Sequence, residues 1–253
     1  MVGGRRLEAV RLGPPPGEAP SFVLLHEGLG SIMSWRDFPE RFAERTGFGV
    51  FAYSRAGYGA SDPAPLPCPL TYLDDEARVT LPQVLGQARI EDCILLGHSD
   101  GGSIAALYAG LGGDRRVRRV VLIAPHFFVE ERTLSGIRAA QAAFEGGELW
   151  QKLVRRHGTN ARMAYEGWRD LWLDPRFRTW NASDALEHLT VPTLMIQGRD
   201  DVYGTLGQVD YLRGRAVSVE TLILPDCGHV PHFEQPEPVL DAITRFVAAA
   251  PRV

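Results

Sequence analysis

One serine in the sequence stands in a setting that favours nucleophilic chemistry. Ser99 is the centre of residues 97–101 (GHSDG), the only match to the pattern G-x-S-x-G in the chain. The apolar run CILL precedes this motif and the helix-like stretch GSIAALYAG follows it. A serine on a tight strand-to-helix turn projects its Oγ over the sheet, and the flanking glycines relieve crowding. We therefore predict Ser99 as a nucleophile, with the N-terminus of the following helix stabilising negative charge beside it.

A serine hydroxyl is a weak nucleophile at neutral pH, so Ser99 needs an imidazole base within hydrogen-bond reach. Of the seven histidines, His229 lies in a turn between the apolar run TLIL and the last helical stretch. A turn at the end of a late strand is where a base can reach Ser99, so His229 is the predicted base. His232 is the competing candidate. His98 precedes the nucleophile and is expected to point away from it, into packing.

The acid that orients the base is expected in residues 198–201 (GRDD), directly after the strand-like run TLMI. Two aspartates compete for this role. The spacing from Gly198 favours Asp201, and Asp200 would then serve as a cap or an ion-pair partner at the surface. The order Ser, Asp, His along the chain is the order that accompanies a serine on a strand–turn–helix.

Short aliphatic runs along the chain predict the strands that position these residues. Segments with helical spacing separate most of the runs. This alternation predicts an α/β fold, with a mostly parallel central sheet flanked by helices and a site beyond the carboxyl ends of the strands. Residues 7–12 are expected to form an antiparallel edge strand. The predicted parallel strands are residues 22–25, 49–53, 93–96, 117–123, 193–196 and 221–224.

Residues 126–189 break the alternation, because they contain helix-like stretches and no convincing strand. The stretches are 131–145, 148–156 and 161–173, and the segment holds four of the five tryptophans. Large aromatic side chains supply rigid apolar area for packing or for lining a pocket. We name Trp150, Trp168 and Trp172 as candidate substrate-binding residues, with packing as the alternative for each.

Five motifs in a fixed order resemble those of the α/β-hydrolase superfamily. They are residues 26–31 (HEGLGS), 54–61 (SRAGYGAS), 97–101 (GHSDG), 198–201 (GRDD), and 228–229 (GH) followed by 234–236 (EQP). The resemblance covers nearly the whole chain and implies the α/β-hydrolase fold. It also implies a helical cap, or lid, over residues 126–189, with the core formed by residues 1–125 and 190–253.

The resemblance also suggests an oxyanion hole in residues 26–31. The usual His-Gly pair of the family is His26-Glu27 here, and by position we expect the N–H groups of Gly28 and Asp100 as the donors. A second departure is Ser54, where the family commonly has an aspartate. The carboxylates of Glu27 and Asp100 flank the presumed reaction centre, so cationic or neutral substrates would be preferred if both face the pocket. The alternative is that Asp100 serves the helix N-terminus and Glu27 forms an ion pair outside the site.

Composition and charge exclude several other classes of protein. Among the 253 residues 45% are hydrophobic and 23% charged, and the formal net charge is −4, so we expect no nucleic-acid partner. The three cysteines are too few for a disulfide framework, which fits a reducing compartment. The start of the chain lacks the apolar region of a signal peptide, and no long apolar window suggests a membrane span. The expected location is therefore the cytoplasm.

We expect no metal and no cofactor. The alternative is a metal site formed by Asp226, His229 and His232. The sequence, however, contains neither H-E-x-x-H nor paired cysteines, which are common metal-binding patterns. No G-x-G-x-x-G opens a helix after the first strand, so a dinucleotide is not indicated.

The predicted function is a serine hydrolase that cleaves small or medium carboxylic esters through an acyl-enzyme on Ser99. The same three residues would serve a C–C bond hydrolase, a lactonase, a thioesterase or a cofactor-free perhydrolase. A non-catalytic ligand-binding protein on the same fold is the alternative from another class. The sequence leaves the natural substrate and the oligomeric state open.

Overall fold

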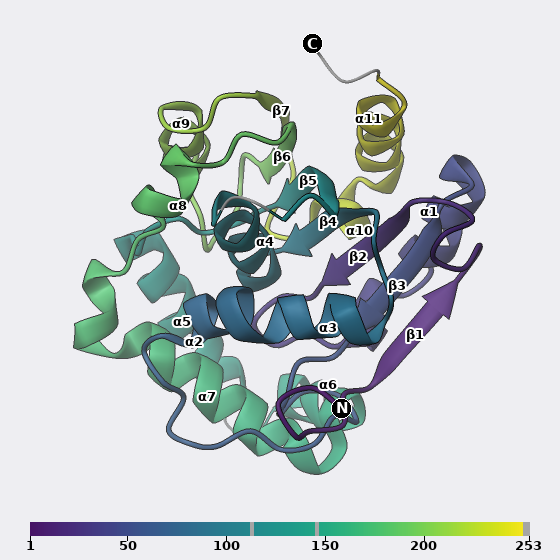
Figure 1. The fold of residues 1–253 in the computed structure, drawn as a ribbon. Coiled ribbons are helices and arrows are strands. Elements are labelled where there is room, and N and C mark those ends of the chain that lie inside the picture. Colours follow the sequence, from purple (N-terminus) through teal and green to yellow (C-terminus); the bar gives the residue numbers. More distant parts are fainter. Residues whose placement is uncertain (112–113, 145–146, 250–253) are drawn as a thin grey trace.

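The computed structural model describes residues 1–111, 114–144 and 147–249, and within these ranges seven strands form one sheet (Figure 1). β1 pairs with β3 in the antiparallel sense, and the other neighbouring strands are parallel. The predicted mostly parallel sheet with an antiparallel edge is therefore confirmed. In the order β1-β3-β2-β4-β5-β6-β7, the strands are β1 (Ala9–Leu12), β3 (Gly49–Tyr53), β2 (Ser21–Leu25), β4 (Cys93–His98), β5 (Val117–Ile123), β6 (Thr193–Gly198) and β7 (Val219–Leu224).

Two of the predicted parallel strands have the expected bounds, β3 and β5, and the other four are one or two residues longer. The additional residues include glycine and polar side chains. Gly97 and His98 at the end of β4, for example, pair with Leu122 and Ile123 of β5. Backbone pairing does not depend on side-chain polarity, so the apolar pattern ends before the strand does.

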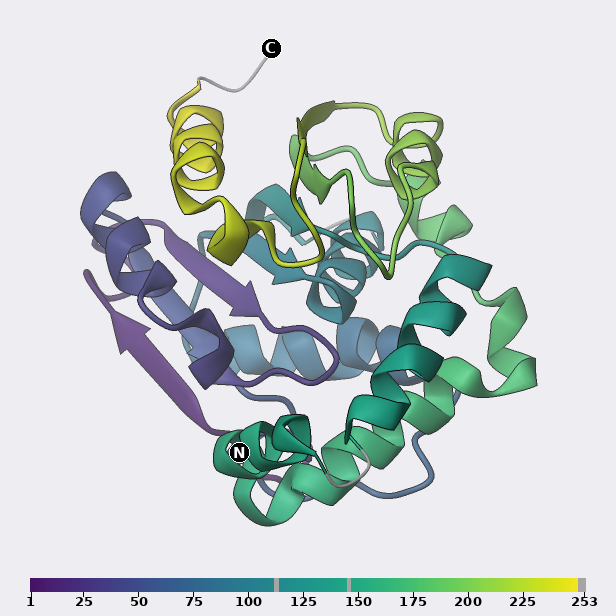
Figure 2. The ribbon, with the colours of Figure 1, turned by 180° about the vertical axis from the view of Figure 1, so that it is seen from behind.

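The two faces of the sheet carry two separate apolar layers. On one face Phe22 and Leu24 of β2 pack with α1 (Phe38–Thr46) and α11 (Pro236–Ala248) (Figure 2). On the other face Val23 and Leu25 pack with the remaining core helices. Successive strand residues point to opposite faces, which explains the division. These helices are α2 (Tyr72–Asp75), α3 (Leu81–Gln87), α4 (Asp100–Gly110), α8 (Ser183–Glu187) and α9 (Gly207–Arg213), with the π-helical turn η2 (Glu76–Thr80) between α2 and α3.

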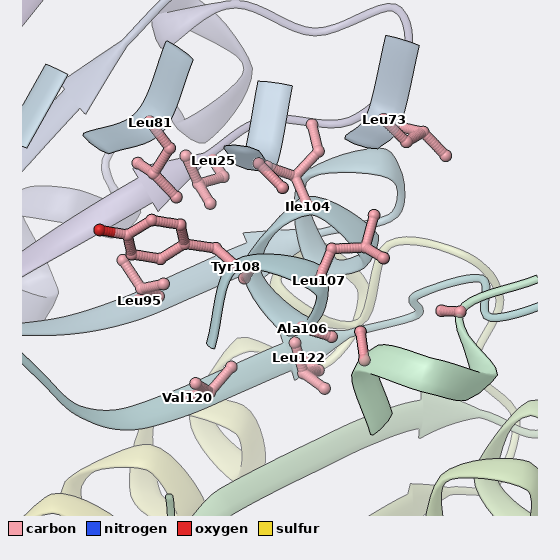
Figure 3. Close-up of a cluster of buried hydrophobic side chains, with 14 of the residues drawn as sticks. Leu25, Leu73, Leu81, Leu95, Ile104, Ala106, Leu107, Tyr108, Val120 and Leu122 are labelled. Atoms are coloured by element: carbon pink, nitrogen blue, oxygen red, sulfur yellow. The ribbon is translucent and has the colours of Figure 1, made fainter. Parts of the chain in front are cut away.

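The helix α4 lies at the centre of the second layer. Figure 3 shows Ile104, Leu107 and Tyr108 of α4 between the strands and the helices that carry Leu73 and Leu81. Ten of the eleven residues of α4 are buried, so this helix is apolar all round and is fixed on every side. The turn that precedes α4 is thereby held in place.

Three further helices follow β5 in the chain: α5 (Glu131–Phe144), α6 (Glu148–His157) and α7 (Ala161–Leu173). The predicted ranges 148–156 and 161–173 agree with α6 and α7 to within one residue, and Glu145, the predicted end of the first helix, lies outside the described residues. α5 and α7 pack together and share a cavity with Ser99, so they lie over the carboxyl ends of the strands. No helix in the described ranges is long and apolar enough to cross a membrane.

Glycine is required where β4 turns into α4. A Cβ atom on Gly101 would lie 2.0 Å from the carbonyl oxygen of Leu25 in β2, and a Cβ on Gly97 would lie 2.1 Å from the carbonyl oxygen of Gly101. Both neighbours are backbone atoms, which cannot rotate away. α4 therefore approaches the sheet more closely than any residue with a side chain allows.

We predict that Gly101→Ala destabilises the protein by about 3 kcal/mol, which lowers Tm by about 6 to 12 °C, because the methyl group forces α4 away from β2. Thermal unfolding followed by circular dichroism measures the change. The matched control is Gly86→Ala in α3, where an added Cβ has no atom within 4 Å. That variant should gain about 0.5 to 1 kcal/mol, since alanine favours a helix over glycine. Equal unfolding temperatures for the two variants would contradict the close-packing argument.

Candidate active site

Ser99 occupies the turn between β4 and α4 in a strained conformation. Its φ of 53° and ψ of −120° lie outside the regions that residues with a side chain ordinarily adopt. Its N–H donates to the carbonyl oxygen of Ile123 at 2.9 Å, which ties the turn to β5. Such strain persists only where the surrounding structure enforces it, and it is concentrated at functional sites.

His229 lies on the loop after β7 and connects Ser99 with Asp201. The Ser99 Oγ is 3.0 Å from Nε2 of His229, and Nδ1 of the same ring is 2.8 Å from Oδ2 of Asp201. A carboxylate oxygen only accepts, so Nδ1 carries the proton and Nε2 is free to accept from the serine hydroxyl. The structure thus places the three predicted residues in one hydrogen-bonded row, an arrangement that can turn a serine into a nucleophile.

Asp201 is held as an ionised carboxylate. It is 1% exposed, and it accepts hydrogen bonds from the N–H groups of Tyr203 at 2.7 Å and Gly204 at 3.2 Å and from the amide of Gln197 at 2.8 Å. Burial alone would raise the pKa of Asp201, but the contact with His229 and these donors lower it to about 2. The adjacent Asp200 is exposed, and its backbone N–H donates to Cys227. Of the two candidates, Asp201 is therefore the one in contact with His229.

Ser99 and His229 border a cavity of about 120 Å³, which we call the Ser99 cavity. Trp168 and Trp172 line it, whereas Trp150 lies against Tyr165, with 6.0 Å between ring centres, and is not among the described residues of the lining. The lining consists of Glu27, Gly28, Leu29, Ser99, Asp100, His126, Thr133, Ile137, Phe144, Trp168, Trp172, Tyr203 and His229.

The two predicted oxyanion donors border the same cavity. Asp100 is the first residue of α4, so its N–H has no acceptor within the helix. A Cβ on Gly28 would lie 2.4 Å from the ring of Trp168 and 3.0 Å from Oδ2 of Asp100, so only glycine fits at this point of the loop. Gly28 and Asp100 therefore both border the cavity beside Ser99.

The pKa values of the two acidic residues beside Ser99, Asp100 and Glu27, are shifted in opposite directions. Asp100 is 2% exposed, and burial raises its pKa to about 6, although the charge of Arg55 and the ring of Trp172 oppose the shift. Burial would also raise the pKa of Glu27, but the neighbouring His98 and Arg156 hold it well below its usual range. Arg156 Nη1 lies 3.5 Å and His98 Nδ1 3.7 Å from the Glu27 carboxylate. Glu27 thus lines the cavity and is ion-paired as well.

Arg55, to which the sequence reasoning gave no role, fixes the loop that carries Gly28. This arginine is 1% exposed, and its guanidinium donates to the carbonyl oxygens of His26 at 2.5 Å and Glu27 at 2.9 Å. Its backbone N–H donates to Nε2 of His26 at 3.1 Å. The sequence feature that could have identified Arg55 is its position in the motif 54–61.

His157, at the end of α6, is a second residue that the sequence reasoning missed. Its Nε2–H donates to the carbonyl oxygen of Leu29 at 3.0 Å, and its Nδ1 accepts from the N–H of Gly59 at 2.9 Å. Arg156 donates to the same Leu29 oxygen at 3.0 Å. Burial lowers the pKa of His157 to about 4, so the ring is neutral as these two bonds require. No pattern in the sequence pairs α6 with this loop.

The other histidines near the site have different environments. His98 donates from Nε2 to the carbonyl oxygen of His229 at 2.8 Å, so it supports the backbone of the base. His232, the competing base candidate, packs on Trp35 with 5.2 Å between ring centres, and burial holds its pKa well below the usual value. Within the described residues no three His, Cys, Asp or Glu side chains are grouped as metal ligands.

Comparison with known proteins assigns the family. Residues 22–242 match the alpha/beta hydrolase family. The chain belongs to this family. Together with its esterase and lipase relatives, the match identifies the protein as an enzyme, a hydrolase.

The proteins similar to this chain include a lipase, an esterase and a hydrolase. The chain is 24% identical to the sn-1-specific diacylglycerol lipase ABHD11 of Danio rerio, over 91% of this chain and 79% of that protein. It is 25% identical to the pimeloyl-[acyl-carrier protein] methyl ester esterase of Nitrosomonas europaea, over 87% of this chain and 93% of that protein. Among solved structures, the 2-hydroxy-6-oxo-6-phenylhexa-2,4-dienoate hydrolase of Rhodococcus has a TM-score of 0.81 at 19% identity, covering 98% of this chain and 96% of that one.

The contact between Asp201 and His229 leads to a prediction for the two adjacent aspartates. Asp201→Asn should slow covalent labelling of Ser99 by a fluorophosphonate by about 10³-fold or more, because the amide can no longer hold the Nδ1–H tautomer of His229. Mass spectrometry of the intact hydrolase follows the labelling. Asp200→Asn is the matched control and should label at the wild-type rate. The reverse order of the two rates would refute the geometric choice of Asp201.

Proposed function

We propose that this hydrolase cleaves carboxylic esters of small or medium size through an acyl-enzyme on Ser99. The observation that carries the proposal is the hydrogen-bonded row in which Ser99 Oγ lies 3.0 Å from His229 Nε2 and His229 Nδ1 lies 2.8 Å from Asp201 Oδ2. The relatives named as lipases and esterases support ester substrates, and the cavity of about 120 Å³ supports small acyl groups.

In the first half of the proposed reaction, Ser99 Oγ attacks the ester carbonyl carbon while its proton passes to Nε2 of His229. The resulting oxyanion accepts hydrogen bonds from the N–H groups of Gly28 and Asp100, each typically contributing about 3 kcal/mol. The C–O bond to the alcohol then breaks, and His229 returns the proton to the departing oxygen. Asp201, ionised throughout the neutral range, stabilises the imidazolium that forms between these steps.

In the second half, water attacks the acyl carbon as His229 takes one of its protons. The bond to Ser99 Oγ breaks, the proton returns to that oxygen, and the carboxylic acid leaves. No other reactant is required. Residues 126–189, apart from α8, which packs on α4 in the core, act as the cap in this proposal, since α5 and α7 contribute Thr133, Trp168 and Trp172 to the lining. Of the three tryptophans named from the sequence, Trp168 and Trp172 are thus proposed to contact the acyl group, and Trp150 to support them.

Removal of the Ser99 hydroxyl tests the proposal directly. Ser99→Ala should lower kcat for p-nitrophenyl butyrate by about 10³-fold or more, because no other group can form the acyl-enzyme, with no change in Tm. Ser103→Ala, which removes a hydroxyl one turn further along α4, should still react with a fluorophosphonate. Retention of more than a few per cent of activity in Ser99→Ala would rule out this role. A wild-type protein that resists labelling would instead support a binding function.

We further propose that the Ser99 cavity prefers neutral or ammonium-bearing acyl groups to anionic ones. Asp100 supplies the carboxylate, since the charge of Glu27 is already balanced by Arg156, whose Nη1 lies 3.5 Å away. The charged or titratable groups around Asp100 include Arg55, His229, Glu27, Tyr58, Cys68 and Tyr72. A nearby ammonium would gain about 1 to 4 kcal/mol from the carboxylate, depending on exposure to water.

The preference should depend on pH, because the pKa of Asp100 is raised to about 6. Phenyl esters of β-alanine, butyrate and succinate present an ammonium, a methyl and a carboxylate on one chain length. The ratio of kcat/KM for the β-alanine ester to that for the butyrate ester should rise as Asp100 ionises above pH 6. In Asp100→Asn, which keeps the backbone N–H, the ratio should be lower and lose this rise. Equal ratios in the two proteins at pH 8 would exclude Asp100 as a determinant of substrate charge.

A further inference from the structure

A second cavity, of about 230 Å³, borders a different face of α7 from the Ser99 cavity. Met163, Ala164 and Gly167 line the second cavity, whereas Trp168 and Trp172 line the first. Among the described residues the two linings have no member in common. The second cavity is thus a separate space, lined by residues of α7, of the helical stretch from α2 to α3, of the segment 56–69 and of the first residues of the chain. Figure 1 shows α7, α3 and the N-terminus on the same side of the molecule.

The walls of this cavity are mostly apolar, and one buried carboxyl group stands among them. We call it the Glu76 cavity after that residue. An apolar cavity with a few placed polar groups is the usual form of a small-molecule site. The apolar members of its lining include Val2, Leu7, Ala56, Ala64, Pro65, Leu66, Pro69, Val79, Met163 and Ala164.

Glu76 lacks a partner for one of its oxygens. The residue is 7% exposed, and Oε2 is shielded from solvent with no hydrogen-bond partner among the described residues. Burial raises the pKa of Glu76 to about 7, although the charge of Arg55 and the hydroxyl of Thr80 oppose the shift. A buried, unpaired carboxyl oxygen is costly in free energy, and native structures rarely retain one without a purpose.

The cationic side chains near Glu76 are Arg55 and Arg5, and both donate hydrogen bonds to oxygen atoms other than those of Glu76. Arg55 donates from Nε to the hydroxyl of Tyr72 at 2.7 Å and from its other nitrogens to the loop carbonyls of His26 and Glu27. Arg5 donates from Nε to the carbonyl oxygen of Pro63 at 3.1 Å. The remaining acid in the lining, Asp75, already accepts from Thr71 at 2.7 Å. Asp75 is also exposed, so Glu76 is the buried acid of this lining.

The backbone at Glu76 departs from a regular helix. Residues Glu76–Thr80 form a π-helical turn, in which the N–H of Leu81 donates to the carbonyl oxygen of Glu76. Such turns are rare and are found frequently at functional sites. Glu76, Val79 and Thr80 of this turn all line the cavity, so the irregular turn forms one of its walls.

We propose that the Glu76 cavity binds a small molecule with an apolar body and a primary ammonium head, with the head on Glu76 and the body between the π-helical turn and α7. The apolar walls account for the body and the unpaired carboxylate for the head. This site is separate from Ser99 and does not depend on the proposed ester hydrolysis.

The test is isothermal titration of the full chain with n-hexylammonium at pH 8, where Glu76 is ionised. Saturable binding is expected, at least tenfold weaker in Glu76→Gln and absent for hexanoate. Asp100→Asn is the matched control: it removes the buried carboxyl group of the Ser99 cavity, so n-hexylammonium that binds in that cavity is lost and the binding that depends on Glu76 is kept. Val79→Trp, at a position that is 53% exposed at the edge of the cavity, should block binding without a change in the core.

The results separate the two cavities. Binding lost in Glu76→Gln and in Val79→Trp but kept in Asp100→Asn supports the proposal. The proposal is overturned if the wild type shows no saturable binding or if Glu76→Gln binds with unchanged affinity. It is also overturned if binding is lost in Asp100→Asn alone, or if hexanoate binds as tightly as n-hexylammonium.

Discussion

The close contact between the backbones of α4 and β2 determines the geometry of the candidate site. Gly101 of α4 lies against the carbonyl of Leu25, and the next residue along the chain, His26, begins the loop that carries Gly28. Ser99 precedes Gly101 by two residues, so this contact brings the serine and the loop to the same cavity. A side chain at position 101 would separate α4 from β2 and would move Ser99 away from Gly28. The glycines of the turn are therefore required because α4 lies so close to β2, and less because they make the backbone flexible.

The loop that begins at His26 is held by side chains from other parts of the chain, since loop carbonyls buried away from water need donors. Arg55 supplies donors for two of these carbonyls from the core side. Arg156 and His157 supply donors for the Leu29 carbonyl from α6. The position of Gly28 thus depends on the helices that follow β5 as well as on the core. In the proposed reaction, the segment over the cavity would then contribute to the oxyanion geometry and not only to substrate size.

The sequence was sufficient for the fold and for Ser99, Asp201 and His229, which the structure brings together, because local patterns mark these features. It did not mark His126, Thr133 and Tyr203, which line the same cavity. Alternating apolar runs and helical spacing define the strands and helices, and the glycines of the 97–101 motif define the turn. The contacts between distant segments could not be predicted in this way. Ser54, at the position where the family commonly has an aspartate, donates to the carboxylate of Glu8 at 2.7 Å, and that carboxylate also accepts from the N–H of Ala60 at 3.0 Å. A carboxylate from beside β1 thus lies at this turn, and no local pattern marks it.

Asp100 and Asp201 show how the fold gives two buried carboxyl groups opposite properties. Both are nearly inaccessible to water, at 2% and 1% exposure, and burial acts on each in the same direction. The pKa of Asp201 is lowered to about 2 because His229 and the N–H of Tyr203 stabilise its charge against the effect of burial. The pKa of Asp100 is raised to about 6 because burial outweighs the opposing charge of Arg55. The neighbouring charges and donors, and not the depth of burial alone, therefore decide the pKa of each group. In the proposed reaction, Asp201 is the carboxylate that stabilises the imidazolium, and Asp100 changes charge close to neutral pH at the wall of the Ser99 cavity.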